Sequence, residues 1–282
     1  MAGASMKDIK LRIKSVESTM QITKAMQLVA TSKLRRAKER MESSKPYASV
    51  SRRAIQAAAA RCTDQSVPFV NPREEKRRCY VVIAGDRGLA GGYNANIFKL
   101  VAAHSEGSNY CVLPLGRKAI DKYHRMGIES LSDEYARVEG MTVGQCYSIA
   151  QSLIAGYLEE KFDALYLVYT GFKTMMTQEA ESEQLLPVPK PAEESMNKPG
   201  STVYELEAGE TLQMVMPDFL AGRIYSALCD SYASEVASRR SAMDSATKNA
   251  GEMISDLRLK YNRARQGAIT QEITEIVAGA EQ

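Results

Sequence analysis

Several residue types that build enzyme sites and disulfide-bonded domains are scarce in this chain of 282 residues. Tryptophan is absent, histidine occurs twice, and the five cysteines are scattered at Cys62, Cys79, Cys111, Cys146 and Cys229. No Cys-x-x-Cys pair is present, and zinc sites need clustered Cys and His ligands. We therefore expect no metal site, and buried or idle thiols of the kind found in a reducing compartment.

Long apolar runs are also missing. No stretch approaches the ~18 consecutive apolar residues of a membrane-spanning helix. The first residues, MAGASMKDIK, lack the apolar core of a secretory signal. We expect a protein that is soluble, or peripheral to a membrane at most, with no segment inserted into the bilayer.

Motifs for nucleotide chemistry are incomplete. The glycine-rich segment GDRGLAGGYN (85–94) could hold a phosphate at a helix start, but it matches neither the Walker loop nor G-x-G-x-x-G. We interpret it as a tight strand-to-helix turn with Asp86 and Arg87 as a local pair. A nucleotide-binding enzyme using this turn is the alternative. His104 and His124 are expected to be solvated surface residues, so we expect no catalytic residue and no cofactor.

Charge is balanced overall but unevenly distributed. The formal net charge is +3, yet residues 1–61 carry fourteen Lys/Arg against four Asp/Glu, while residues 179–210 carry eight Glu against two Lys. Such segments can be ordinary solvated faces, or a basic shaft attracted to an acidic partner. Basic helices also suggest nucleic acid. Acidic residues interleave with the arginines near the C-terminus, so we expect no nucleic-acid partner.

A long helix is predicted over residues 1–61. Apolar or small residues recur at steps of four and three, which is typical of a coiled-coil seam. The seam consists of Ile9, Ile13, Val16, Met20, Thr23, Ala30, Leu34, Ala37 and Met41. A helix of this length cannot be buried in a globule of this mass, so it must protrude or pair. A second row, Ile22, Met26 and Val29, could face another partner.

A Rossmann-like α/β domain is predicted over residues 77–208, after a linker at 62–76 that contains two prolines. β-branched runs at 79–85, 109–116 and 163–172 predict buried strands of a largely parallel sheet, and 142–160 predicts a helix. Residues 128–135 and 203–206 are candidates for short strands. The proline- and glutamate-rich stretch 183–203 indicates a mobile loop or an extended edge.

Helical periodicity returns in the last segment, assigned to residues 209–282, with Pro217-Asp218 as a helix start. Its seam includes Tyr232, Val236, Met243, Ala246, Ala250, Met253, Leu257, Ala264 and Ala268. Gly251 and Gly267 weaken the helix, and close backbone approach would explain them. We expect the N- and C-terminal helices to pack as an antiparallel coiled coil with the α/β domain inserted between them.

Three blocks carry a resemblance to a known family. They are RIKSVESTMQITKAMQLVATSKLRRA (12–37), GDRGLAGGYN (85–94) and YNRARQGAITQEITEIVAGA (261–280). In this order the chain resembles the gamma subunits of bacterial F-type ATP synthases over essentially its whole length. Ala90 stands where the family often has Cys, and the regulatory cysteine insert of the chloroplast type is absent.

The resemblance implies a non-catalytic rotor shaft, peripheral on the cytoplasmic side of the cell membrane. It implies contacts of the shaft with the alpha and beta subunits, and of the α/β domain with the epsilon subunit and the membrane ring of c subunits. Rotation would couple ion flow to ATP synthesis or hydrolysis. Carried over by position, the residues expected at the alpha and beta interface are Met26, Arg239, Arg265, Gln266, Thr270 and Glu272.

Overall fold

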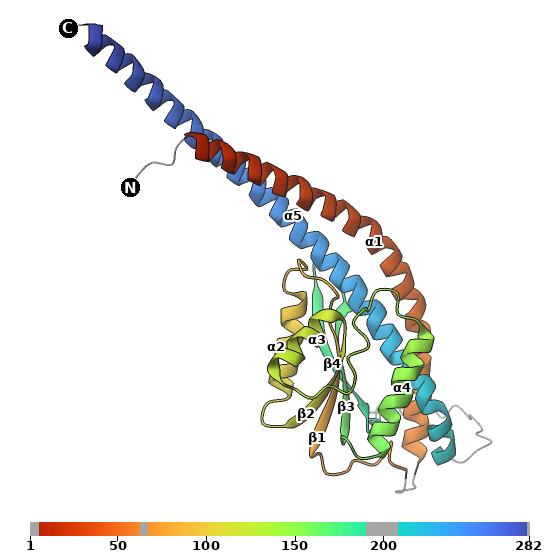
Figure 1. The fold of residues 1–282 in the computed structure, drawn as a ribbon. Coiled ribbons are helices and arrows are strands. Elements are labelled where there is room, and N and C mark those ends of the chain that lie inside the picture. The colour runs from red at the N-terminus through yellow and green to blue at the C-terminus, as the bar shows by residue number, and fades with distance from the viewer. Residues whose placement is uncertain (1–5, 63–66, 190–207, 281–282) are drawn as a thin grey trace. The chain divides into compact units, whose positions relative to one another are not determined.

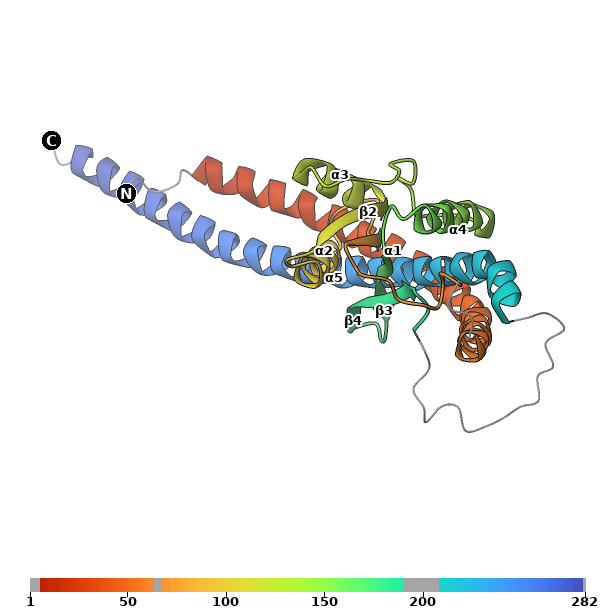
Figure 2. The ribbon, with the colours of Figure 1, turned by 90° about the horizontal axis from the view of Figure 1, so that it is seen from below.

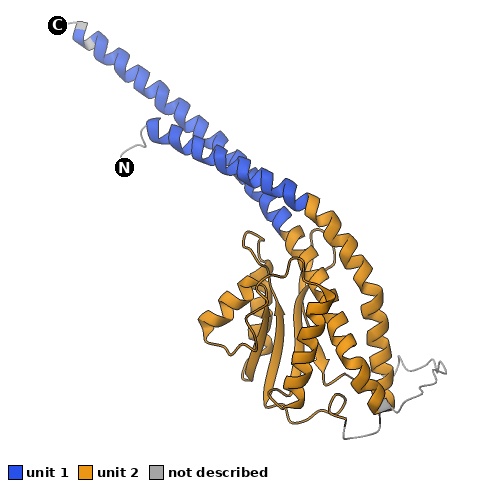
Figure 3. Ribbon diagram, turned by 45° about the vertical axis from the view of Figure 1, so that its right-hand side comes forward, with its two compact units in different colours: residues 1–31, 239–282 blue, residues 32–238 orange. Residues whose placement is uncertain are grey.

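The computed structural model describes residues 6–62, 67–189 and 208–280. Its elements, shown in Figure 1, are α1 (Met6–Arg61), β1 (Arg77–Ile83), α2 (Tyr93–His104), β2 (Asn109–Leu115), α3 (Arg117–Met126), α4 (Val143–Leu158), β3 (Ala164–Phe172), β4 (Gln178–Leu186) and α5 (Ala208–Ala280). The chain divides into two compact units (Figure 3). We call residues 1–31 with 239–282 the paired-helix unit, and residues 32–238 the sheet unit.

The sheet has the strand order β2-β1-β3-β4. β1 pairs in parallel with β2 and with β3, as expected from strands that alternate with helices. β4 pairs antiparallel with β3, and the sequence analysis had assigned its last residues, from Glu183, to a loop or edge. The sequence QEAESEQLL is too polar to be recognised as a strand. It can be polar because most of its side chains are only half-buried at the edge of the sheet.

Two apolar layers cover the sheet. Alternate β1 residues point to opposite faces, as strand geometry requires. Tyr80 and Val82 pack with Ile97 of α2 and Tyr123 of α3. The opposite face, which includes Val81, packs against α4 and the parts of α1 and α5 that belong to the sheet unit. Figure 1 shows α2 and α3 on one side of the sheet and α4 on the other.

The start of α5 corrects the sequence analysis. The helix begins at Ala208, so Pro217 lies inside it and does not start it. An internal proline removes one helical hydrogen bond and costs about 3 kcal/mol. Burial offsets that cost, because Leu212, Met216 and Leu220 around the proline are fully buried. Pro46 likewise lies inside a helix, α1.

Helix α4 agrees with its sequence signals. Thr142 caps it, with its hydroxyl accepting the Gln145 N–H while the Gln145 side chain accepts the Thr142 N–H. Of the two short strands proposed, the first is reduced to one parallel bridge between Val112 and Ser130. The second, at 203–206, lies outside the described residues.

One histidine prediction was wrong. His104 is half-buried, its ring Nδ1 lies 2.9 Å from the Tyr80 hydroxyl, and its ring packs 4.7 Å from that of Tyr166. Burial lowers the pKa of His104. His124 is exposed, as expected.

The burial of the cysteines agrees with the expectation of buried or idle thiols. The five cysteines lie in the described residues and none is in a disulfide; four are buried and Cys62 is half-buried.

The explanation proposed for two helical glycines was also wrong. A Cβ at Gly251 or Gly267 would meet no heavy atom of the described residues within 4 Å. Close packing therefore does not require glycine at either position.

Candidate functional site

The paired-helix unit carries the residues that the sequence analysis assigned to partner binding. In it, α1 up to Thr31 and α5 from Arg239 lie side by side, as the views of Figures 1 and 2 agree. Three polar pairs join them: Glu17–Arg258, Thr23–Thr247 and Gln27–Asp244. As the residue number of the α1 partner increases, that of the α5 partner decreases. The two helices therefore run antiparallel, as predicted.

The seam between these helices is built of small and medium apolar side chains. Its buried members are Ile9, Thr23, Ala30, Met243, Ala250, Ile254 and Leu257. Met253 was expected in the seam but is 45% exposed, and Ile254 takes its place. The small residues let the two backbones approach closely, which suits knobs-into-holes packing.

Polar pairs set the register within this seam. The hydroxyls of Thr23 and Thr247 are 2.8 Å apart, and Gln27 Nε2 donates to Asp244 Oδ1 at 2.9 Å. A hydrogen bond from Lys248 lowers the pKa of Asp244, and Gln27 adds to the effect. Half-buried hydrogen bonds of this kind disfavour a shifted register, because a shift would leave their groups unpaired.

Several large apolar side chains are exposed on the α1 part of this unit. Leu11, Ile22, Leu28 and Val29 of α1 are each 58–64% exposed, and Met26 beside them is half-buried. Leu11, Ile22 and Val29 share one face of α1, because they are eleven and seven residues apart, whereas Leu28 lies about 100° around the helix from them. Exposed large apolar side chains grouped on one helix face mark a candidate interaction surface.

Four of the expected site residues lie on the last turns of α5. Arg265, Gln266, Thr270 and Glu272 are all exposed, and they lie within two helical turns of one another. Thr270 Oγ1 donates to the Gln266 carbonyl at 2.9 Å, so that hydroxyl is used within the helix.

The same turns carry an apolar stripe. Ile269, Ile273, Ile276 and Val277 are 48–67% exposed. This end of α5 therefore combines polar and apolar side chains, all of them exposed.

The two remaining site residues lie elsewhere in the unit. Arg239 is half-buried at the first position of α5 in this unit, 26 residues or roughly 39 Å of helix before Arg265. Met26 lies on α1, one residue before the Gln27 that pairs with Asp244. The structure thus divides the six predicted residues into two groups along the helix pair.

In the sheet unit, the glycine-rich turn is part of the packing. The Gly85 N–H donates to Asn94 Oδ1 at 2.9 Å. The Asp86 carboxylate accepts the N–H groups of Val138 and Glu139 at 2.9 and 3.1 Å, so the expected Asp86–Arg87 pair was wrong. The carboxylate turns toward the 138–139 loop because two backbone donors there would otherwise be unpaired.

A row of serines on α5 fixes that helix beneath the turn. The Ser231 hydroxyl lies 2.9 Å from the Tyr93 hydroxyl and accepts the Thr170 N–H at 3.1 Å. Ser238 donates to the Ala90 carbonyl at 2.7 Å. These serines were not predicted, because a pattern based on apolar residues does not include them.

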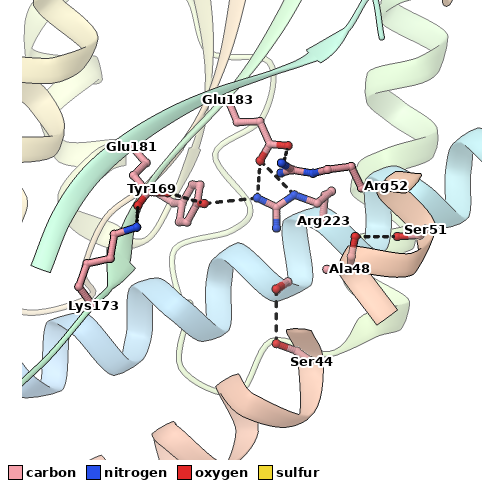
Figure 4. A network of polar contacts seen from close by, with 10 residues as sticks. Ser44, Ala48, Ser51, Arg52, Tyr169, Lys173, Glu181, Glu183 and Arg223 are labelled. Atoms are coloured by element: carbon pink, nitrogen blue, oxygen red, sulfur yellow. Dashed lines mark hydrogen bonds and ion pairs between the residues drawn. The ribbon is translucent and has the colours of Figure 1, made fainter. Parts of the chain in front are cut away.

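A second polar cluster joins α1, α5 and the edge strand in the sheet unit (Figure 4). Arg223 of α5 donates through Nε to Glu183 at 3.0 Å, and Arg52 of α1 pairs with the same carboxylate. Arg223 also approaches the Tyr169 hydroxyl at 3.4 Å. Burial raises the pKa of Tyr169 to about 12. The cluster holds two long helices to one strand by charged hydrogen bonds.

A third contact reaches α1 from the loop before α4. Lys33 Nζ pairs with Glu139 Oε1 at 2.6 Å, and the Tyr232 hydroxyl donates to the same oxygen at 2.9 Å. The hydrogen bond from Lys33 lowers the pKa of Glu139. Within the sheet unit, both α1 and α5 therefore form polar contacts at two places, with strand β4 and with the loop before α4.

The described residues hold no group of three or more His, Cys, Asp or Glu side chains placed to bind a metal. Among the helices in the described ranges, none combines the length and apolar character needed to cross a membrane. The polar side chains of the sheet unit described above make packing contacts within that unit.

Comparison with known proteins gives one consistent result. An ATP synthase family model matches residues 5–282. The ATP synthase gamma chain of Ruminococcus albus is 43% identical over 278 residues, covering 97% of this chain and 96% of that one. The gamma chain of Desulforamulus reducens is 40% identical over 279 residues, covering 98% of each.

Solved structures agree in fold. The Euglena gracilis mitochondrial ATP synthase, OSCP/F1/c-ring in rotational state 3, contains a chain with a TM-score of 0.66 at 16% identity, covering 98% of this chain and 93% of that one. The central stalk/c-ring of the Tetrahymena thermophila enzyme gives 0.57 at 23% identity, with 80% and 99% covered. Taken with the near full-length relatives, these findings establish that the chain belongs to the ATP synthase gamma chain family.

Proposed function

We propose that this chain is the central rotor shaft of an F-type ATP synthase. The observation that carries the proposal is the antiparallel helix pair, which buries one face of each helix and leaves Ile22, Leu28 and Val29 exposed. A helix pair with an apolar outer face suits a shaft held inside a ring of other subunits. Membership of the gamma chain family supports it, and so does the likeness in fold to chains of a central stalk and of a rotor.

The partners follow from the same proposal. The alpha and beta subunits surround the paired-helix unit, and the sheet unit contacts the epsilon subunit and the membrane ring of c subunits. The complex then holds the chain at the cytoplasmic side of the cell membrane, without a segment in the bilayer. The chain contributes no catalytic residue.

The mechanism depends on asymmetry. The exposed residues of the helix pair differ from one side to another, so three equivalent neighbours around it meet different surfaces. A shaft can change the nucleotide affinity of a neighbour only through a difference in contact free energy between states. Rotation moves each contact from one neighbour to the next, which couples ion flow through the membrane sector to ATP synthesis or hydrolysis.

Six residues form the proposed contacts with alpha and beta. Met26 and Arg239 act along the paired stretch, and Arg265, Gln266, Thr270 and Glu272 act at the end of α5. Exposure of the last four supports this assignment, since exposed arginine and carboxylate side chains can form bidentate pairs with a partner.

The experiment is reconstitution of the complex with variants of this chain. Arg265→Ala should lower ATP synthesis severalfold while the free energy of unfolding of the chain stays unchanged, because the side chain is exposed. Lys76→Ala is the control, since Lys76 is 74% exposed, lies before β1 and is not among the six residues assigned to alpha and beta.

Unchanged coupling in Arg265→Ala would remove the role assigned to Arg265. A rotor subunit should co-purify with alpha and beta in fewer copies than beta. If the wild-type chain does not, the rotor assignment itself is overturned.

A further inference from the structure

A groove in the sheet unit is not used by any contact described above. It lies between α2 and α3, beside the edge strand β2, and has a volume of about 550 Å³. That size falls within the range of small-molecule sites, roughly 300–1,000 Å³. Ala95 and Ala102, seven residues apart on one face of α2, leave it hollow because neither side chain reaches across it.

Aromatic rings line the groove. Phe98 and Tyr123 meet edge to face with ring centroids 5.9 Å apart, and Tyr110 of β2 lies beside them. Tyr123 is only 3% exposed, and its hydroxyl has no hydrogen-bond partner within the described residues. This hydroxyl is also out of contact with solvent, so Tyr123 offers the groove its ring and not its hydroxyl.

Positive charge surrounds these rings. Lys99 of α2 and Lys122 and Arg125 of α3 line the groove, and none of the three forms a salt bridge within the described ranges. Arg125 donates through Nε to the main-chain carbonyl of Asp121 at 2.8 Å, which leaves its other nitrogens available. Three cations without a carboxylate partner attract an anion.

We propose that the α2–α3 groove binds an organic polyphosphate that carries a flat aromatic ring, the chemistry of a nucleoside di- or triphosphate. The ring packs on the aromatic side chains, as bases do on protein aromatics. The phosphates lie against Lys99, Lys122 and Arg125. The site is separate from the 85–94 turn, whose Gly85 N–H is already occupied by Asn94. It adds ligand binding to the shaft function proposed above.

Titration calorimetry of the full-length chain with ATP tests the proposal. We expect saturable binding, weakened about tenfold by the double change Lys122→Gln and Arg125→Gln, which removes two charge-assisted contacts. Tyr110→Leu should weaken binding roughly fivefold by removing one stacking surface. Lys118→Gln is the matched control, because Lys118 belongs to α3 but does not line the groove.

Fragments of ATP test the contributions of the charged residues and of the aromatic residues separately. Inorganic tripolyphosphate tests charge alone and adenosine tests the ring alone, and both should bind more weakly than ATP. Equal affinity for tripolyphosphate and ATP, together with no effect of Tyr110→Leu, would overturn the ring assignment. Binding that survives the double variant but is lost in Gly91→Ala would overturn the groove in favour of the 85–94 turn.

A measurement on the wild-type chain avoids any folding defect of the variants. ATP should protect Lys99 and Lys122 from acylation, read by mass spectrometry, and leave Lys161 reactive. Lys161 is 59% exposed and lies outside the groove. No saturable ATP binding at millimolar concentration, or equal reactivity of all three lysines, would contradict the proposal.

Discussion

Arg223 is the most deeply buried charge in the polar cluster of the sheet unit. Its side chain is 6% exposed, whereas that of Arg52, which shares the Glu183 carboxylate, is 42% exposed. Removing one member of a buried pair leaves an uncompensated charge, while an exposed pair is worth little. The two arginines bind the same carboxylate but should contribute very differently to stability.

We expect Arg223→Met to lower the free energy of unfolding of the chain by about 3 kcal/mol. Arg52→Met is the matched control and should lower it by less than about 1 kcal/mol. Urea unfolding of the two variants gives both values. Equal losses would mean that burial does not decide the strength of this cluster.

Burial also makes stability depend on pH at the residue scale. It raises the pKa of Cys146 to about 12, from an ordinary value of 9.0. Between about pH 9 and 12 the unfolded chain has lost this proton while the folded chain keeps it. The unfolded state then binds fewer protons, so stability falls as pH rises, by up to about 1.4 kcal/mol per pH unit.

Cys146→Ala should therefore reduce the decline in unfolding free energy between pH 8 and pH 10.5, measured by urea unfolding at each pH. Tyr169, whose pKa burial raises to about 12, still contributes above pH 10 in both proteins. Ser148→Ala, an exposed and non-titrating change on the same helix, is the control. A slope that Cys146→Ala leaves unchanged would contradict the assignment.

At the scale of elements, α5 contains two glycines, Gly251 and Gly267, at which no packing contact within the described residues requires the absence of a side chain. Gly251→Ala and Gly267→Ala should each stabilise α5 by up to about 1 kcal/mol, because alanine is the better helix former and open space surrounds both positions. Hydrogen exchange of the α5 amides would report slower exchange around each site.

Gly222, which belongs to the part of α5 in the sheet unit, serves as the control for these changes. A Cβ there would overlap the Tyr47 ring, so Gly222→Ala should destabilise the chain. Faster exchange in Gly251→Ala or Gly267→Ala would show that glycine has another role in α5. One such role is a bend that partners require, which would appear as lost coupling in the assembled complex.

At the scale of the whole molecule, folding and coupling depend on different parts of the chain. Side chains from Arg265 to Val277 are all exposed, so the end of α5 adds little to the stability of the isolated chain. Removing residues 268–282 should change the free energy of unfolding by less than about 0.5 kcal/mol. The same truncation should lower ATP synthesis in the reconstituted complex, because it removes Thr270, Glu272 and the isoleucine stripe.

The two readouts must diverge for this prediction to hold. Parallel loss of stability and synthesis would mean that the tail supports the fold of the chain. Intact synthesis after truncation would show that contacts nearer Met26 and Arg239 are sufficient.

Periodic patterns in the sequence determined the long helices, the alternation of strands and helices, and the antiparallel pairing. These features follow from local chemistry, since seam residues such as Leu34 and Leu257 repeat with the period of the helix that buries them. The three sequence blocks also pointed to the gamma chain family.

Only the tertiary structure decided which polar residues work together. Glu183 and Arg223, or Ser231 and Thr170, are far apart in sequence and carry no periodic signal that pairs them. Likewise β4 and the start of α5 depend on burial by distant elements, which overrides a polar strand sequence and an internal proline. The conformational preference of a local sequence is small compared with the free energy of packing, so these features cannot be predicted from the local sequence alone.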